Sequence, residues 1–286
     1  MALMIAVNRL WNQEKHLLWA ALMFYTRVPV PAAYEHSDHN FNQSRKYFPL
    51  IGLITGALAS LVILAGSIAL PLSVSVALSM AATILFTGAF HEDGFADCCD
   101  GFGGGWDKTQ ILTIMKDSRV GAYATIGMIM LLGLKFTSLF EIGLNSVVLL
   151  ALVLLNGHTL SRLGASVAIE RLDYVQDIDK SKIKPINIAP LSRQDWVVSC
   201  LFAIPTLIWL LLYQPATIIA LPVLAGAWWL MCQYFERRIG GYTGDCLGAM
   251  QQVLELLFYI AVLSVCLLHT SPSPRDATLS RMPSSA

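Results

Sequence analysis

The chain has 286 residues, of which 56% are hydrophobic and 13% are charged, and its mean hydropathy is +0.60. Soluble domains carry about 25% charged residues, so this composition excludes an ordinary soluble protein and indicates one that crosses a membrane several times. The net charge is zero, so the chain lacks the overall basic field of a nucleic-acid-binding protein. Its six cysteines form no C-x-x-C pair, which argues against a zinc site built on that motif.

The apolar segments predict an all-α fold, a polytopic integral membrane helix bundle. The first apolar run, residues 17–25, is too short to cross a bilayer core of about 30 Å, so we expect an interfacial or re-entrant helix there. About seven spans, within a range of six to eight, are expected near residues 49–70, 74–90, 122–139, 144–160, 196–213, 216–235 and 247–269. We expect a single membrane-embedded domain over residues 1–270. The Ser- and Pro-rich tail, residues 271–286, is predicted to be disordered and need not be native, so it enters no functional argument.

The basic residues predict the orientation of the bundle. They concentrate before the first span, after the second, after the fourth and before the seventh, whereas the turns around Pro71, Gly143 and Gln214 have none. Because positive charge marks the cytoplasmic side, we expect these basic segments in the cytoplasm. Lys135 lies inside the third expected span, and we expect its ammonium group to reach the interface along its own aliphatic stem.

The most informative stretch, residues 88–121, connects the second and third expected spans. Asp93, Asp97 and Asp100 occur there at i, i+4 and i+7, which places three carboxylates on one face of a helix. Like charges in this arrangement repel one another, and Mg²⁺, which prefers oxygen ligands, would offset the repulsion. A single aspartate beside a span is as easily a solvated loop residue, and the glycines that follow could form a flexible linker. The three aspartates together favour a magnesium site.

The residues after the acidic helix fit a substrate that contains phosphate. Lys116 and Arg119 supply positive charge, and the planar guanidinium of Arg119 would hold two phosphate oxygens at once. Asp117 is a candidate metal ligand and catalytic residue between them. The candidates for the general base are Asp100 and His91, and Asp100 is preferred.

Other polar residues lie at the predicted cytoplasmic ends of later spans. His158 and Arg162 lie at the end of the fourth, and Thr243 and Asp245 precede the seventh. Ionisable residues at membrane depth are costly, which favours a role in substrate binding. Structural roles stay open for the same residues. His158 could be hydrogen-bonded to its neighbours at a helix end, and Arg162 could anchor the span on the cytoplasmic side. Thr243 or Asp245 could be the N-cap of a helix. Glu255 is expected to face the bundle interior without a specific role.

Several longer motifs contain these residues. They are FYTRVPVP at 24–31, YFPLIG at 47–52, FHEDGFADCCDG at 90–101, MKDSRVG at 115–121, Ser161–Arg162 and GYTGD at 241–245. Together they resemble the cobalamin synthase family, also called adenosylcobinamide-GDP ribazoletransferases, over nearly the whole chain up to the tail. Arg27 and Ser118 lie within these motifs and join the candidate substrate-binding residues.

The resemblance implies a multi-pass enzyme of the bacterial inner membrane that depends on Mg²⁺ and has its active site on the cytoplasmic side. A hydroxyl of α-ribazole, or of its 5′-phosphate, would attack the cobinamide-linked phosphoryl group of adenosylcobinamide-GDP. GMP would leave, and the nucleotide loop of adenosylcobalamin would be closed. The chemistry of the residues agrees with this reaction, because phosphoryl transfer needs positioning and charge neutralisation above all. One or two metal ions on the diphosphate would be held by Asp93, Asp97, Asp100 and Asp117.

Two other functions are compatible with parts of the sequence. A CDP-alcohol-type phosphotransferase would run similar chemistry with another acceptor, but this chain lacks the Ala-Arg that follows D-G-x-x in those enzymes. An ion-coupled transporter would hold its ions near the bilayer midplane between repeated halves, whereas these carboxylates are expected at the surface and no internal repeat is visible. The expected partners are the two substrates and the lipid bilayer, without nucleic acid. A homo-oligomer, the choice of lower base and the phosphorylation of the acceptor stay open.

Overall fold

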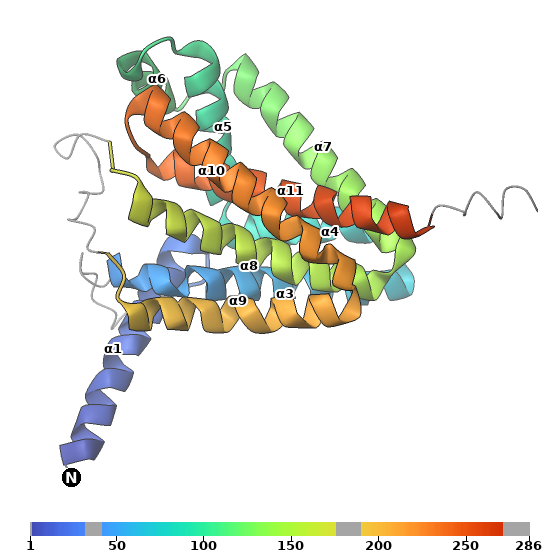
Figure 1. Ribbon diagram of the computed structural model, residues 1–286, viewed down its shortest axis with the longest axis horizontal. Coiled ribbons are helices and arrows are strands. Elements are labelled where there is room, and N and C mark those ends of the chain that lie inside the picture. Colours follow the sequence, from blue (N-terminus) through green and yellow to red (C-terminus); the bar gives the residue numbers. More distant parts are fainter. Residues whose placement is uncertain (1, 32–41, 176–189, 271–286) are drawn as a thin grey trace, which may run out of the picture.

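The computed structural model describes residues 2–31, 42–175 and 190–270. The tail predicted to be disordered, residues 271–286, lies outside this part of the chain. Apart from an isolated bridge between Tyr174 and Tyr242, the regular structure of the described residues is helical (Figure 1). The helices are α1 (Ala2–Tyr25), η1 (Arg45–Tyr47), α3 (Phe48–Ala69), α4 (Leu72–Thr87), α5 (Phe90–Gly104), α6 (Lys108–Met115), α7 (Ala122–Asn145), α8 (Val147–Arg171), α9 (Arg193–Tyr213), η2 (Pro215–Ile219), α10 (Ala220–Ile239) and α11 (Gly244–Thr270).

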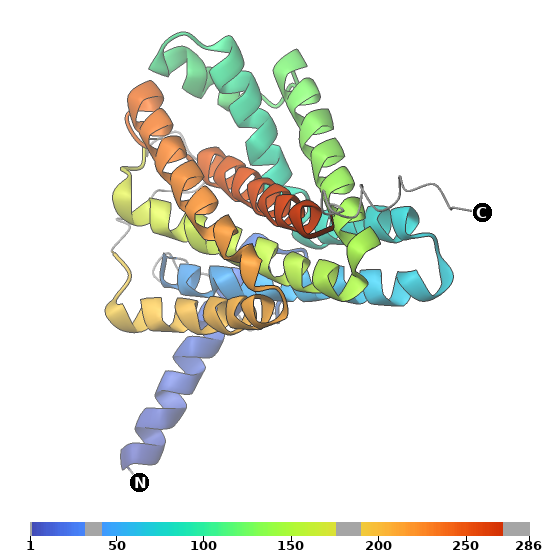
Figure 2. The same cartoon turned by 45° about the vertical axis from the view of Figure 1, so that its right-hand side comes forward.

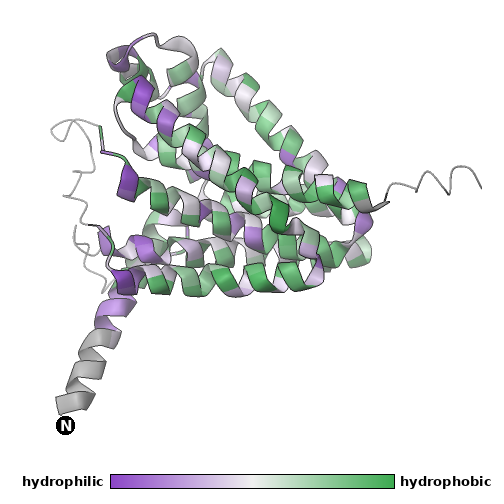
Figure 3. Cartoon of the chain, viewed as in Figure 1, coloured by the Kyte–Doolittle hydropathy of each residue, from purple (hydrophilic) through white to green (hydrophobic). Residues whose placement is uncertain are grey.

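Six helices in the described residues are long and apolar enough to cross a membrane, or seven if α4 and α5 form one broken span. The predicted all-α polytopic bundle is therefore confirmed. Hydrophobic residues run along the bundle helices, and hydrophilic ones gather around α6 and the adjoining end of α10 (Figure 3). On α9, large apolar side chains such as Trp209 and Leu212 are exposed, as expected for a surface that contacts lipid.

The connections between the spans fall at two ends of the bundle. The start of α3, the end of α8, the start of α9 and the turn between α10 and α11 lie at one end, together with α6. The turns from α3 to α4 and from α7 to α8 lie at the other end, with the end of α11 (Figures 1 and 2). This is the alternation that the basic residues predict. Which end faces the cytoplasm stays a prediction.

The N-terminal helix is longer than the expected segment 17–25. Its apolar half packs on the bundle through Leu17 and Ala21, which are buried, whereas its first half points away (Figure 1). Glu14 fastens it by accepting hydrogen bonds from Lys46 Nζ at 2.9 Å and from Tyr47 Oη at 2.6 Å. Helix α1 is not among the helices apolar enough to cross a membrane, and its position relative to the bilayer stays a prediction.

Helix α8 lies at the centre of the bundle and corrects one predicted boundary. The fourth span was expected to end at residue 160, but α8 continues to Arg171. The polar residues that suggested an end are buried among other helices, so they mark a polar interior and not a return to water. Helix α3 reaches α8 closely at Gly52 and Gly56; a Cβ atom on Gly56 would lie 2.8 Å from the carbonyl oxygen of Leu154.

A sharp turn between α4 and α5 sets the direction of the acidic helix. The two helices meet at 89°, and the turn uses left-handed backbone at Gly88 (φ 68°) and at Ala89 (φ 57°). Ala89 is the one residue other than glycine with positive φ in the described part of the chain, and this conformation is costly for a residue with a Cβ atom. The N–H of Arg27 donates to the carbonyl oxygen of Phe86 at 2.8 Å. This bond holds the end of α1 against the turn.

Candidate active site

Carboxylates gather where α5 packs against the start of α11, and we call Asp93, Asp97 and Asp245 the acidic ridge. The negative charges of Asp93, Asp245 and Asp100 all act on Asp97, and that of Asp93 acts on Asp245. The prediction that α5 is a helix carrying these aspartates is confirmed. The structure adds Asp245, which the sequence suggested only as a separate substrate-binding residue.

Two glycines allow α5 and α11 to approach so closely. A Cβ atom on Gly94 would lie 3.0 Å from Cα of Asp245, and one on Gly248 would lie 3.2 Å from the carbonyl oxygen of His91. Both distances are shorter than ordinary van der Waals contacts between carbon and its neighbours. A larger residue at either position would therefore separate the helices and move Asp245 away from α5.

The acidic ridge offers oxygen ligands that are free to bind a cation. Within the described residues, no hydrogen bond or ion pair engages the side chain of Asp93 or Asp97. No group of three or more His, Cys, Asp or Glu side chains among these residues is placed so that it could hold a metal ion by itself. Mg²⁺ usually takes only one or two carboxylates and completes its shell with water and substrate phosphates. The donor set of the ridge therefore fits Mg²⁺ bound together with a phosphate ligand.

Asp100 has a structural task that the sequence did not reveal. Its Oδ2 accepts a hydrogen bond from the N–H of Gly121 at 2.6 Å, and its Oδ1 accepts one from the N–H of Ala124 at 2.9 Å. These amides lie at the start of α7 and lack partners within that helix. Asp100 therefore caps α7 and fastens the linker before it to α5. Its proposed roles as metal ligand and general base stay predictions.

The linker between α6 and α7 carries four candidate residues, which the structure leaves accessible to solvent. Lys116 and Ser118 are exposed. The guanidinium of Arg119, 88% exposed, forms an ion pair with Asp117 in which Nη2 lies 2.5 Å from Oδ2. The hydrogen bonds of this pair are the main cause of a lowered pKa for Asp117 and a raised pKa for Arg119. Asp117 therefore interacts with Arg119, and the structure does not bring it into the acidic ridge.

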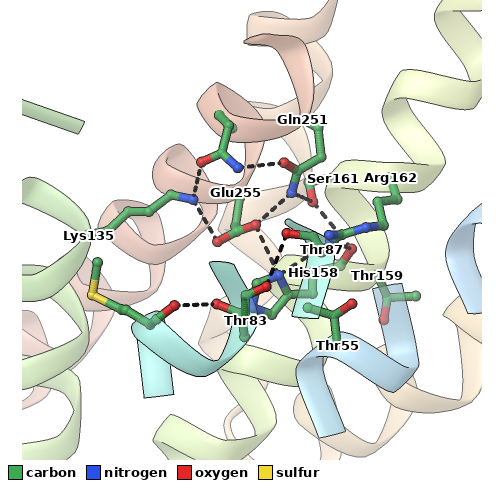
Figure 4. A network of polar contacts seen from close by, with 12 residues as sticks. Thr55, Thr83, Thr87, Lys135, His158, Thr159, Ser161, Arg162, Gln251 and Glu255 are labelled. Atoms are coloured by element: carbon green, nitrogen blue, oxygen red, sulfur yellow. Dashed lines mark hydrogen bonds and ion pairs between the residues drawn. The ribbon is translucent and has the colours of Figure 1, made fainter. Parts of the chain in front are cut away.

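A second polar group lies inside the bundle, between α7, α8 and α11, and we call it the inner network (Figure 4). Its members are Lys135, His158, Ser161, Arg162, Gln251, Gln252, Glu255 and Tyr259. With hydroxyl side chains of α3 and α4, several of them line a pocket with about 430 Å³ of unfilled space, counting the part open to solvent.

Glu255 is the centre of the inner network. Its carboxylate accepts hydrogen bonds from Lys135 Nζ at 2.8 Å, Gln251 Nε2 at 2.6 Å and Tyr259 Oη at 3.1 Å, and His158 Nδ1 lies 3.1 Å away. Figure 4 shows Lys135, Gln251 and His158 converging on it from three directions. A buried carboxylate is costly unless it is paired and hydrogen-bonded, and here four side chains supply those bonds.

Lys135 contradicts the sequence-based expectation. Its side chain does not reach the interface: it is 5% exposed and its Nζ lies 2.5 Å from Gln252 Oε1 as well as 2.8 Å from Glu255. An ammonium group extends along its stem to water only when no partner is available inside, and α11 provides two partners. The prediction of an interfacial lysine was wrong.

His158 and Arg162 lie in the middle of α8 and not at a helix end. Both are buried, and Arg162 Nη1 donates to the carbonyl oxygen of His158 at 3.0 Å. The Arg162 guanidinium also lies over the Phe48 ring, 5.8 Å from its centre. These contacts argue against the cytoplasmic anchor that was open for Arg162. A direct contact with substrate stays a prediction for both residues.

The remaining candidate residues, His91, Thr243 and Arg27, differ in their burial and in their contacts. His91 is 2% exposed and stacks on Phe48 with 5.7 Å between ring centres, so its imidazole lies inside the bundle. Thr243 is also buried, and its hydroxyl accepts a hydrogen bond from the N–H of Cys246 at 3.3 Å as the N-cap of α11. The N-cap reading of Thr243 therefore holds. Arg27 is exposed, and its side chain lies against Gly88 at the turn before α5.

Sequence reasoning missed the partners that complete the inner network, namely Gln251, Gln252 and Tyr259. A signal was present, because Gln251, Glu255 and Tyr259 follow one another at intervals of four residues. That spacing places polar groups on one face of a transmembrane helix. Polar side chains on one such face almost always point into the bundle and not into lipid.

The fold and these two polar groups define an all-α membrane protein with an acidic site at one end of its helix bundle. The family model described as cobalamin-5-phosphate synthase matches residues 17–263. The chain therefore belongs to the cobalamin-5-phosphate synthase family, and it is a transferase. The resemblance inferred from the motifs is confirmed.

Curated relatives support the same assignment along nearly their whole length. The chain is 42% identical over 253 residues to the adenosylcobinamide-GDP ribazoletransferase of Shewanella amazonensis, covering 88% of this chain and 96% of that protein. It is 41% identical over 260 residues to the protein of that name from Shewanella frigidimarina, covering 89% and 97%. Among solved structures, none matches the chain.

Proposed function

We propose that this protein transfers the adenosylcobinamide phosphoryl group from adenosylcobinamide-GDP to α-ribazole, or to α-ribazole 5′-phosphate, with release of GMP. The observation that carries the proposal is the acidic ridge, three carboxylates without a cationic partner among the described residues. The linker that presents Lys116 and Arg119 is fastened to the same helix, α5, by the hydrogen bond from Gly121 to Asp100. The names of the curated relatives supply the substrates.

The proposed step breaks one bond and forms one. An oxygen of the acceptor hydroxyl attacks the phosphorus atom next to cobinamide, the bond from this phosphorus to the GMP oxygen breaks, and GMP leaves with the electron pair. The hydroxyl proton passes to a carboxylate of the protein. Bound at the acidic ridge, Mg²⁺ would neutralise charge on the diphosphate.

The residues of this chain then have distinct tasks. One or two carboxylates of the acidic ridge, from Asp93, Asp97 and Asp245, would hold the metal and so help to fix the diphosphate there. Arg119 and Lys116 bind phosphate oxygens, and Arg119 would exchange the carboxylate of Asp117 for phosphate, which suits its fork equally well. For the proton acceptor, Asp100 remains the preferred candidate, since His91 is buried away from solvent.

We infer that the acidic ridge and the linker face the cytoplasm of a bacterial inner membrane. The support is the charge distribution: the bundle end with the ridge also carries Arg237 and Arg238 at the end of α10, and Arg171 at the end of α8. The turns at the opposite end carry no basic residue. Positive charge favours the cytoplasmic side.

The test is GMP release by purified protein in detergent or vesicles, given adenosylcobinamide-GDP, α-ribazole and Mg²⁺. We expect release that needs both the acceptor and the metal, stops with EDTA and resumes when Mg²⁺ is added in excess. A parallel reaction with α-ribazole 5′-phosphate identifies the acceptor, and one with a CDP-alcohol donor tests the alternative enzyme class. Activity that persists in EDTA would contradict the metal role, and transfer from the CDP-alcohol alone would replace the proposed reaction.

A further inference from the structure

Helix α5, which carries Asp93 and Asp97, is held by side-chain hydrogen bonds near its start and near its end and, between them, by a weaker contact in which Cys98 Sγ lies 4.0 Å from Cys246 Sγ of α11. Near its start, Glu92 Oε1 accepts a hydrogen bond from Gln252 Nε2 of α11 at 3.0 Å. Near its end, Asp100 binds the first amides of α7. The two ridge carboxylates between these points have no side-chain partner among the described residues, so their direction depends on how α5 as a whole is held.

The bond to Glu92 is the last link of a chain that begins deep in the bundle. Lys135 on α7 donates to Gln252 Oε1 at 2.5 Å, and Gln252 donates in turn to Glu92. Lys135 itself is kept in place by Glu255 at 2.8 Å. Because an ammonium group only donates, it turns the oxygen of the Gln252 amide toward α7 and leaves the NH₂ group to face Glu92, which as a carboxylate only accepts.

The hydrogen bond from Gln252 matters for the orientation of Glu92, because the other oxygen of the Glu92 carboxylate is not held by a hydrogen bond within the described residues. Its second oxygen, Oε2, is buried and has no hydrogen-bond partner in the structure. The bond from Gln252 is therefore the one that draws Glu92 toward the bundle interior. Adjacent residues of a helix are rotated by about 100°, so a side chain of Glu92 held inward fixes the outward direction of Asp93.

We propose that Lys135 and Gln252 are positioning residues for the acidic ridge: by orienting Glu92 they set the rotation of α5 and the direction of its metal-binding carboxylates. The inference rests on the proposed function for the catalytic meaning of the ridge, but the positioning itself is independent of it. A residue of α7, far from the ridge in sequence, thus acts on the ridge through one amide.

A thiol on α5 reports the rotation of the helix without metal or substrate. Cys99 is half-buried and packs against α7, where a Cβ atom on Gly127 would lie 2.6 Å from its Sγ. Rotation of α5 away from its position would expose this sulfur. The rate of maleimide labelling at Cys99, resolved by mass spectrometry of the peptide, is therefore a direct readout.

The decisive variant is Gln252→Met, which keeps the length of the side chain and removes its hydrogen bonds with Lys135 and Glu92, together with the one that it donates to Gln251 Oε1 at 2.9 Å. We expect Cys99 of this variant to be labelled several-fold faster than Cys99 of the wild type. Half-maximal GMP release should need a several-fold higher Mg²⁺ concentration. The same increase is expected for the Mg²⁺ concentration that gives half of the Mg²⁺-dependent rise in unfolding temperature. Tyr259→Phe is the matched control, because it removes a bond to Glu255 at 3.1 Å without touching Glu92. It should leave the labelling rate and the Mg²⁺ requirement unchanged even if it lowers stability.

A pair of variants at Glu92 keeps the test decisive if Gln252→Met does not fold. Glu92→Ala should behave as Gln252→Met does, whereas Glu92→Gln, which retains an oxygen to accept the bond, should behave as wild type. Wild-type labelling of Cys99 in Gln252→Met, or in Glu92→Ala, would overturn the positioning role. Faster labelling in a protein whose wild type releases no GMP would instead overturn the proposed function and leave the positioning role standing.

Discussion

The buried ion pair between Lys135 and Glu255 predicts that removal of the lysine charge will destabilise the folded protein. The perturbation is Lys135→Met, which keeps an unbranched side chain of similar length and removes the ammonium group. In the structure this group lies 2.5 Å from Gln252 and 2.8 Å from Glu255, and both members of the ion pair are buried. The variant therefore leaves a buried carboxylate without its lysine partner.

The expected loss follows from what remains around Glu255. Removing one partner of a buried ion pair costs about 3–5 kcal/mol. Glu255 keeps hydrogen bonds from Gln251 and Tyr259 and its contact with His158, so we take the lower end, about 3 kcal/mol. For a chain of this size that corresponds to a fall in unfolding temperature of about 6–12 °C. A lysine that extended to the interface would change the free energy of unfolding by no more than about 0.5 kcal/mol.

The measurement is thermal unfolding in detergent, followed by tryptophan fluorescence at matched protein and detergent concentrations. Lys108→Met is the matched control, since Lys108 is exposed, and it should unfold close to wild type. Glu255→Gln and the double variant complete a double-mutant cycle, in which the double variant should lose about 1 kcal/mol less than the sum of the singles. The reasoning is refuted if Lys135→Met is as stable as Lys108→Met, or if the two single losses simply add.

The remaining predictions concern the ridge, the linker and the orientation of the bundle. Asp97→Asn should lower the rate of GMP release by a factor of about 10²–10³, and in EDTA its unfolding temperature should be no lower than that of the wild type. The control Asp173→Asn, at an exposed aspartate, should leave both properties unchanged. Near-normal turnover in Asp97→Asn would contradict a metal role. Arg119→Lys should lower GMP release about tenfold at saturating Mg²⁺ through the loss of one charge-assisted hydrogen bond, and wild-type rates at every donor concentration would leave it no phosphate role. Labelling of intact cells from outside should reach a cysteine at Asn145 and miss one at Thr109, both exposed positions, and the reverse pattern would invert the topology.

The spans and the acidic helix were predictable because their signals are local. An apolar run long enough to cross a bilayer is visible in one segment, and so is the spacing of Asp93, Asp97 and Asp100 along one helical face. The same locality explains the misplaced end of α8. The hydropathy of His158 and Arg162 shows that they avoid lipid, but it does not tell a polar bundle interior from the aqueous surface.

The missing parts of the site depend on contacts between distant segments. Lys135 and Glu255 are 120 residues apart in the chain, and no spacing rule connects them. Asp245 joins the ridge because Gly94 and Gly248 let two helices approach, and a glycine in a sequence does not name the helix that it will contact. Asp100 shows the converse: its place in a motif suggested chemistry alone, while its bonds to Gly121 and Ala124 show a capping role as well.

The two polar groups differ in how completely they are satisfied, and this difference separates their functions. The inner network joins acid, base and amide groups into a connected set of hydrogen bonds, which rigidifies a bundle at membrane depth. The acidic ridge brings like charges together, and the described residues supply no cation for Asp93 or Asp97. Repulsion between these carboxylates is unfavourable by itself, and the proposed Mg²⁺ would offset it. In the proposed function, the hydrogen bond from Gln252 to Glu92 connects the two polar groups and would help to hold α5 in the position in which its carboxylates bind metal and phosphate.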